Sequence, residues 1–223
     1  MRITSTSVSA IAHRLENKKS GLSEALIGFH ALTGSDFTSA FHRMGKVRPL
    51  QRLINKGTDQ HLSALRSLTS AVDVAAVTSY VCALYGHNID DIDEARFKTF
   101  LRISGGKTDE PLANLKKMNC AILPPCSKTL LKHIERSNFV ARMWRRADDV
   151  NPTEGQHPLD FGWVTSDSGF QPLWFSGSAV PCTLGLSQTN TVADLDERSA
   201  GDDDASSIWS EDSVESEDEF CHL

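Results

Sequence analysis

The chain lacks any long apolar stretch. No run reaches about eighteen apolar residues, the length that a membrane-spanning helix requires, and residues 1–12 lack the apolar core of a signal peptide. Cysteine is scarce as well: the five cysteines are odd in number and irregularly spaced. Such cysteines are typical of reduced thiols in a cytosolic or nuclear protein. We therefore expect an intracellular chain, nuclear or cytoplasmic, without a membrane partner.

Acidic residues are few outside the C-terminal region. Residues 194–219 hold twelve acids and one base, a net charge of −11, whereas the whole chain carries −6. The rest of the chain is therefore mildly basic, at about +5. Beyond residue 177 the sequence has no periodicity, and an acidic segment of this kind does not bury enough apolar surface to fold alone. The composition predicts a disordered acidic tail over residues 178–223.

Helical periodicity dominates the basic body. After a short predicted strand at residues 2–8, apolar spacing and breaker residues predict helices over residues 9–16, 23–33, 37–43, 47–55, 59–69, 72–85, 90–103, 109–118 and 127–146. Ser23 is the expected N-cap of the second helix and Asp36 that of the third. The helix over 72–85 is apolar nearly all round, which predicts a central place in the core.

The pattern changes after residue 147. Residues 161–165 and 170–175 read as two strands around Ser166-Asp167-Ser168-Gly169, which predicts a β-hairpin. The expected organisation is an N-terminal region over residues 1–57, a helical bundle over 58–147, a hairpin extension over 148–177 and the tail over 178–223.

The most distinctive segment is ALIGFHALTGSDFTSAFHRMGKVRPLQRLIN at residues 25–55. It resembles the C-terminal part of the PIN-like nuclease domain of the flap-endonuclease superfamily. More closely, it resembles a group of animal proteins associated with mobile elements, as do VCALYG (81–86), LPP (123–125), HIERSNFVARMW (133–144) and FGWVTSDSGFQPLWF (161–175). The resemblance implies a mainly α chain: the helical C-terminal part of an α/β PIN-like fold, followed by the hairpin and the tail.

The resemblance also implies that Asp36, in the Gly34-Ser35-Asp36 turn, is one ligand of a metal site. Two-metal phosphodiester hydrolysis needs several carboxylates around two ions roughly 4 Å apart. The family's other acidic ligands precede this motif, and Glu16 and Glu24 lie on predicted helices. We therefore expect a truncated, catalytically incomplete protein with no catalytic residue of its own, and Mg²⁺ only where an intact site exists. Two alternatives stay open: Asp36 as a plain helix cap, and a metal-dependent endonuclease completed by upstream sequence or by a partner.

Two groups of basic residues are candidates for binding the phosphate backbone of DNA or RNA. The first group surrounds the Gly45 turn, where a helical hairpin can present backbone amides and cations to a phosphate: Arg43, Lys46, Arg48 and Arg52. The second group shares one side of the helix over 127–146, opposite Leu130, Ile134, Ala141 and Trp144: Lys128, Lys132, Arg136, Arg142 and Arg146. The alternative for both groups is an ordinary solvated face.

The acidic tail suggests a function of a different class. It is suited to docking on a basic protein partner, or on the basic residues of its own chain, so a protein-interaction module is the alternative function. Ser216 precedes Glu217-Asp218-Glu219, an acidic context that favours phosphorylation. Phosphorylation there would add roughly −2 in charge and strengthen such docking.

Overall fold

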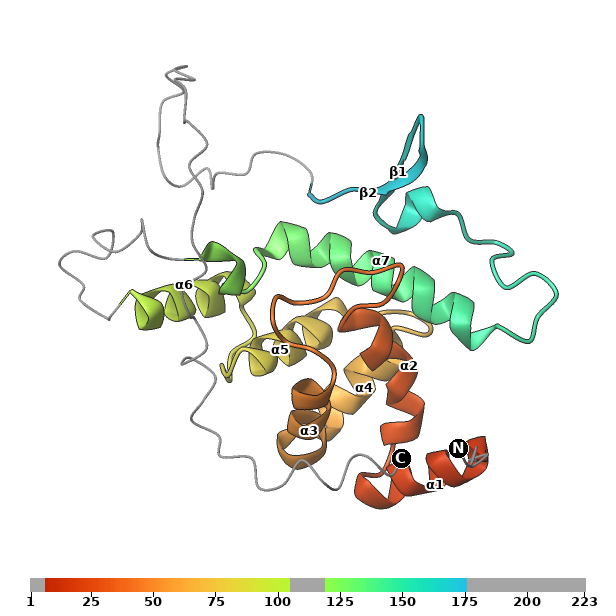
Figure 1. Cartoon of the computed structure of the whole chain (residues 1–223), viewed down its shortest axis with the longest axis horizontal. Helices are drawn as coiled ribbons and strands as arrows, with labels where there is room; N and C mark the ends of the chain where they lie inside the picture. The colour runs from red at the N-terminus through yellow and green to blue at the C-terminus, as the bar shows by residue number, and fades with distance from the viewer. Residues whose placement is uncertain (1–6, 105–118, 176–223) are drawn as a thin grey trace, which may run out of the picture. The chain divides into compact units, whose positions relative to one another are not determined.

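The body of the protein is mainly helical. The computed structural model describes residues 7–104 and 119–175, and Figure 1 shows how the elements are arranged. Its elements are, in chain order, α1 (Val8–Lys18), α2 (Leu22–Leu32), α3 (Val47–Lys56), α4 (Asp59–Ser67), α5 (Val74–Leu84), α6 (Ile92–Ile103), the 3₁₀ turn η2 (Cys120–Ile122), α7 (Ser127–Arg145), the 3₁₀ turn η3 (Pro158–Phe161), β1 (Trp163–Ser166) and β2 (Gly169–Pro172). Within these two ranges the strands form a single two-stranded sheet.

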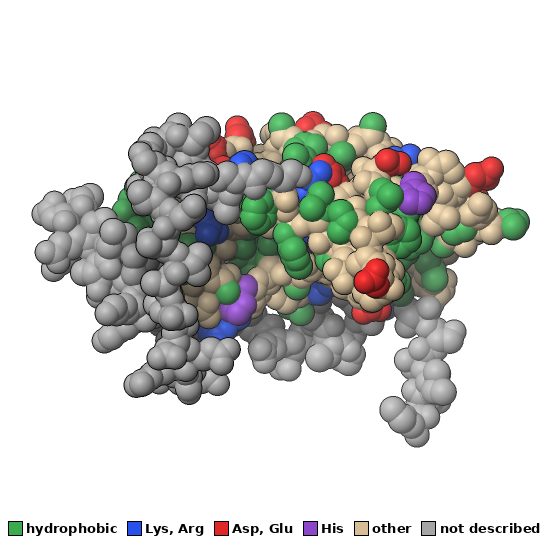
Figure 2. All heavy atoms as spheres, turned by 90° about the horizontal axis from the view of Figure 1, so that it is seen from above, with side chains coloured by type: hydrophobic (Ala, Val, Ile, Leu, Met, Phe, Trp, Pro, Cys, Tyr) green, Lys and Arg blue, Asp and Glu red, His purple; other side chains and the backbone are tan. Residues whose placement is uncertain are grey.

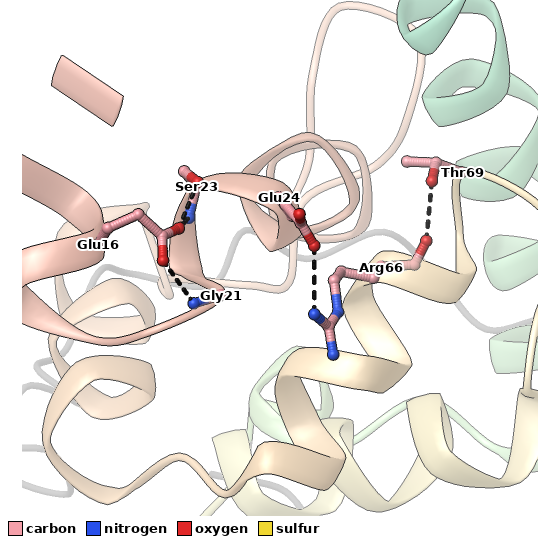
Figure 3. A network of polar contacts seen from close by, with 6 residues as sticks. All are labelled: Glu16, Gly21, Ser23, Glu24, Arg66 and Thr69. Carbon is pink, nitrogen blue, oxygen red and sulfur yellow. Dashed lines mark hydrogen bonds and ion pairs between the residues drawn. The ribbon is translucent and has the colours of Figure 1, made fainter. Parts of the chain in front are cut away.

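The junction of α1 and α2 is closed by the carboxylate of Glu16. It accepts hydrogen bonds from the backbone N–H groups of Gly21 (2.8 Å) and Ser23 (3.0 Å) and from the Ser23 hydroxyl, as Figure 3 shows. These bonds lower the pKa of Glu16. Because the first N–H groups of a helix lack intrahelical acceptors, the carboxylate stabilises the start of α2. Ser23 is therefore not the N-cap: α2 begins after Gly21, whose φ of +78° suits glycine.

The core is built on α2, which packs against α1, α4 and α7. The α2–α4 contact is close because Gly28 faces the backbone of α4: a Cβ on Gly28 would lie 1.9 Å from the Leu65 carbonyl oxygen. On the other side of α4, α5 packs against α4, α6 and α7. Helix α2 thus shares with α5 the central place that the apolar pattern predicts for α5 alone. Fully buried side chains of this core include Leu22, Leu32, Leu65, Leu68, Val77, Val81, Leu130 and Ile134.

The hairpin follows η3, which packs against α7, whereas the strands themselves are mostly exposed. β1 and β2 pair antiparallel, with Trp163 opposite Pro172 and Ser166 opposite Gly169, so Asp167 and Ser168 form a tight two-residue turn. Gly169 has a φ of +108°, which explains the glycine at this turn. The Phe161 ring at the end of η3 packs on Phe139 of α7, with 5.4 Å between the ring centroids.

Most helix predictions are confirmed, with ends that differ by a few residues. The hairpin is also confirmed. The predicted strand at 2–8 is wrong at Val8, which is the first residue of α1. Residues 1–6, the predicted helix at 109–118, the tail beyond residue 177 and Ser216 lie outside the described residues. Among the helices that are described, none is long and apolar enough to cross a membrane.

Candidate functional site

The Gly34-Ser35-Asp36 turn opens a loop that joins α2 to α3. The Ser35 N–H donates to the Thr38 carbonyl (2.9 Å), and the Thr38 hydroxyl donates to the Ala31 carbonyl (2.7 Å). These bonds fold the chain back onto the end of α2. Gly34 has a φ of +109°, and a Cβ there would lie 2.7 Å from Ala40, so the turn requires glycine.

The predicted helix over residues 37–43 is absent. Those residues form bends and turns, so Asp36 caps no helix, and both expectations are wrong. The physical reason is local: the Ser35 and Thr38 side chains bond to each other (2.8 Å) and to nearby backbone groups. Short polar side chains that satisfy the backbone in this way compete with helix formation.

The Asp36 carboxylate is exposed to solvent. It acts electrostatically on His30, whose pKa is lowered by burial and by Lys46 and raised by Asp36. No group of three or more His, Cys, Asp or Glu side chains placed to hold a metal ion occurs in residues 7–104 or 119–175. The donors described around Asp36 therefore do not fit a two-metal site, which needs several carboxylates.

Lys46 points back onto the end of α2. Its ammonium group donates to the carbonyls of His30 (2.8 Å) and Gly34 and to the Thr33 hydroxyl (3.0 Å). An ammonium has three hydrogens, so these acceptors use all of them. They include carbonyls at the end of a helix, which lack intrahelical donors. Burial lowers the pKa of Lys46 to about 8. The predicted phosphate ligand is thus engaged within the fold.

Arg43 and Arg48 present their side chains to solvent. Arg43 has a φ of +55°, which turns the chain before α3, and Arg48 lies in the first turn of that helix. Both are exposed, and neither makes a hydrogen bond or ion pair with the described residues. From Arg43 to Lys56 the chain has five basic residues and no acidic one. Arg52 lies one turn after Arg48 and is anchored, because its guanidinium donates to the Leu84 carbonyl (2.6 Å).

The basic side of α7 is not a simple solvated face. Arg136 is buried, with 1% of its surface exposed, and it donates to the carbonyls of Gly162 (3.1 Å) and Leu173 (2.6 Å) in the hairpin region. Its expected place on the basic exposed side is therefore wrong. A two-stranded hairpin is marginally stable by itself and needs a further element to pack on. The contact between Arg136 and the residues that flank the hairpin supplies such packing, and it explains why Arg136 is buried.

The other predicted bases of α7 are partly engaged as well. Lys132 pairs with Glu135 at 2.8 Å, and Arg146 pairs with Asp149 at 2.6 Å. The Arg142 guanidinium lies 5.7 Å from the centre of the Phe161 ring. Lys128 is exposed. Most of the five predicted bases thus make contacts within α7 or with the chain that follows it.

Figure 2 shows the molecule from above relative to the view of Figure 1. In Figure 1, α7 and the hairpin lie on this upper side. On the part of this face that the grey atoms leave in view, the Lys and Arg side chains appear at separate places among apolar and neutral atoms. Because most of the predicted bases of α7 have partners, the exposed Arg43 and Arg48 are the stronger phosphate-binding candidates.

Sequence reasoning misses the anchoring role of Arg136. The signal that points to it is the aromatic segment FGWVTSDSGFQPLWF, because a two-stranded hairpin is marginally stable alone and needs a further element to pack on. The Arg136 guanidinium also lies 5.4 Å from the centre of the Trp174 ring in that segment. Comparison with models of protein families, with curated proteins and with solved structures finds no match for the chain.

Proposed function

We propose that this chain is a catalytically incomplete protein of PIN-like nuclease ancestry that binds nucleic-acid phosphates without sequence specificity. The ancestry is inferred from the resemblance of residues 25–55. The observation that carries the binding proposal is the pair of exposed guanidinium groups, Arg43 and Arg48, in a segment without acidic residues.

The chemistry of this pair suits a phosphate backbone. Arginine offers a planar fork of N–H donors that matches phosphate oxygens and keeps its charge at every physiological pH. Phosphate contacts position a protein on a nucleic acid but carry no base information. We therefore expect binding that tolerates any sequence and weakens steeply as salt increases, because bound counterions are released.

Removing both charges is expected to weaken the binding. The double variant Arg43→Asn/Arg48→Gln should lower affinity at least tenfold at low salt and reduce the slope of log K against log salt by about 2, one unit for each lost phosphate contact. Asn suits position 43 because it tolerates the left-handed backbone there. The measurement is fluorescence anisotropy of labelled single-stranded DNA, duplex DNA and RNA across a salt series.

A matched control removes two charges elsewhere. Lys98 and Arg145 are exposed on α6 and α7, so Lys98→Gln/Arg145→Gln makes the same change in net charge. The control should keep both affinity and slope near those of the unchanged chain. Equal losses in the two double variants, or binding that does not depend on salt, would refute the assignment to Arg43 and Arg48.

The incomplete metal site leads to a separate expectation. With one exposed carboxylate at the turn, the purified chain should not cleave single-stranded or duplex DNA in Mg²⁺ or Mn²⁺, because two-metal hydrolysis needs several carboxylate ligands. The assay is gel electrophoresis of end-labelled substrates over hours. Metal-dependent cleavage that disappears in Asp36→Asn would contradict this expectation and establish the alternative, an endonuclease.

A further inference from the structure

The hairpin of β1 and β2 stands out from the helices of the body, as Figure 1 shows. Three of the four residues of each strand are exposed. Their apolar side chains include Val164, with 37% of its surface exposed, and Phe170, with 49%. A two-stranded hairpin is marginally stable in water, and a sheet gains stability when further strands join it. The hairpin is therefore open to the addition of another strand.

The register of the hairpin determines which backbone groups point away from it. In an antiparallel pair of strands, opposite residues alternate between pairs that exchange hydrogen bonds and pairs whose N–H and C=O groups point outward. The Leu173 N–H donates to the Gly162 carbonyl (2.9 Å), so Gly162 and Leu173 form a pair of the first type. Counting along the register from this pair, Trp163 and Thr165 are the residues of β1 whose backbone groups point outward.

The two edges of the hairpin differ in the groups that they offer. On β2 the outward positions are Phe170 and Pro172, and proline has no N–H to donate. On β1 both Trp163 and Thr165 present a donor and an acceptor. Within residues 7–104 and 119–175, no backbone–backbone hydrogen bond beyond the hairpin uses these groups. The edge that can accept a strand is therefore that of β1.

The β1 edge also lacks the features that protect most sheet edges. Such edges are usually protected by charged side chains, by proline or by a bulge. The sequence of β1 is Trp163-Val164-Thr165-Ser166, without charge or proline, and its pairing with β2 is regular along the whole strand. An unprotected edge of this kind pairs with another extended chain through main-chain hydrogen bonds.

The β1 strand is complementary to a second copy of itself. When two copies meet antiparallel about a twofold axis at Val164, Trp163 of each copy lies opposite Thr165 of the other. Both residues have outward backbone groups, so each of these two pairs exchanges two main-chain hydrogen bonds. An axis at Trp163 or at Thr165 leaves one such pair instead of two. Val164 meets its own copy on the axis and covers its exposed side chain, and no like charges face each other in β1.

We infer that the protein dimerises through β1, which joins the hairpins of two copies into one continuous antiparallel sheet. The strand is short, so the interface is small and the dimer depends on protein concentration. The inference does not rest on nucleic-acid binding, because Arg43 and Arg48 lie outside the hairpin. The chain has a net charge of −6, and salt screens the repulsion between two copies. Salt should therefore strengthen the dimer, whereas it weakens binding to nucleic acid.

Sedimentation equilibrium of the full chain in a reducing buffer tests the inference. Over about 5–500 μM protein, the unchanged chain should shift from monomer to dimer. Val164→Lys places two ammonium groups opposite each other at the axis and should raise the dissociation constant about fivefold or more. Gln171→Lys is the matched control, because it adds the same charge to the same face of the hairpin but on β2, and it should keep the dimer. A monomer at every concentration, or equal dissociation constants for the two variants, overturns the inference.

Val164→Cys locates the axis directly. In the β1 pairing the two introduced thiols lie on residues whose Cα atoms are about 4.5 Å apart, within the range of a disulfide. After mild oxidation, peptide mapping should find a disulfide between two copies of the peptide that carries the introduced cysteine. Gln171→Cys should give no such product, and the natural cysteines are the same in both variants. Absence of the product in Val164→Cys, at concentrations where the unchanged chain is dimeric, overturns the assignment to β1.

The two proposals of this article fail independently of each other. The double variant Arg43→Asn/Arg48→Gln should keep the dimer and lose affinity for nucleic acid. Val164→Lys should lose the dimer, and as a monomer it should still bind nucleic acid with the salt slope of the unchanged chain. Loss of the dimer in Arg43→Asn/Arg48→Gln would place the contact at the α2–α3 loop and overturn the pairing through β1.

Discussion

Replacing Arg136 with methionine is expected to release the hairpin from α7 and to lower the free energy of unfolding by about 2–4 kcal/mol, the cost of one carbonyl without its donor, a second lost hydrogen bond and a lost ring contact. Methionine keeps most of the buried volume but donates no hydrogen bond. The Leu173 carbonyl would lose the Arg136 donor, the Gly162 carbonyl would keep only the Leu173 N–H (2.9 Å), and the Trp174 ring would lose its cation.

Two measurements check this effect. Urea denaturation gives the change in the free energy of unfolding, and hydrogen exchange at the amides of β1 and β2 shows whether the hairpin opens before the helices do. Arg145→Met is the control on the same helix, because Arg145 is exposed and its loss should stay within about 0.5 kcal/mol. Unchanged protection of the hairpin amides in Arg136→Met would contradict the anchoring role.

The sequence predicts the helices well where apolar periodicity is long. The predicted helices at 47–55 and 127–146 correspond to α3 and α7 within one residue at each end. The signal fails between α2 and α3, because the structure there depends on single hydrogen bonds. Thr38 reaching Ala31, and Lys46 reaching the end of α2, are contacts between residues seven to sixteen positions apart, which periodicity does not encode.

The candidate site shows the same limit for charges. The sequence identifies the basic residues but not their partners. It therefore predicts phosphate binding for Lys46 and Arg136 as well as for Arg48. In the structure Lys46 and Arg136 are engaged with carbonyls, and Arg48 is exposed. Close backbone approaches are equally hidden: Gly28 reads as an ordinary helix residue until α4 is placed against it.

His133 makes the fold sensitive to acid. It is buried on α7, its Nε2 lies 2.8 Å from the Leu32 carbonyl, and its ring packs edge-on against Phe41 at 5.3 Å. Burial lowers its pKa to about 4. The neutral ring donates its Nε2 hydrogen to Leu32 and so joins α7 to the end of α2, next to the Gly34 turn.

The direction of the pH effect follows from this pKa. Between pH 6.5, the ordinary pKa of histidine, and about 4, the unfolded chain binds a proton that the folded chain does not. The stability contributed by the neutral ring is therefore complete above pH 6.5 and is lost as the pH falls to about 4, by up to about 3 kcal/mol. His30, His61 and His87 are less buried, and burial lowers their pKa values in the same direction.

Urea unfolding from pH 7.5 down to pH 4.5 measures this loss, and His133→Gln isolates it. Glutamine does not titrate, and its amide can still donate to the Leu32 carbonyl, so the variant should lose the largest part of the slope below pH 6.5. His13→Gln is the control, because His13 is exposed on α1, and its slope should match that of the unchanged chain. An identical slope in His133→Gln would mean that protonation elsewhere drives the acid unfolding.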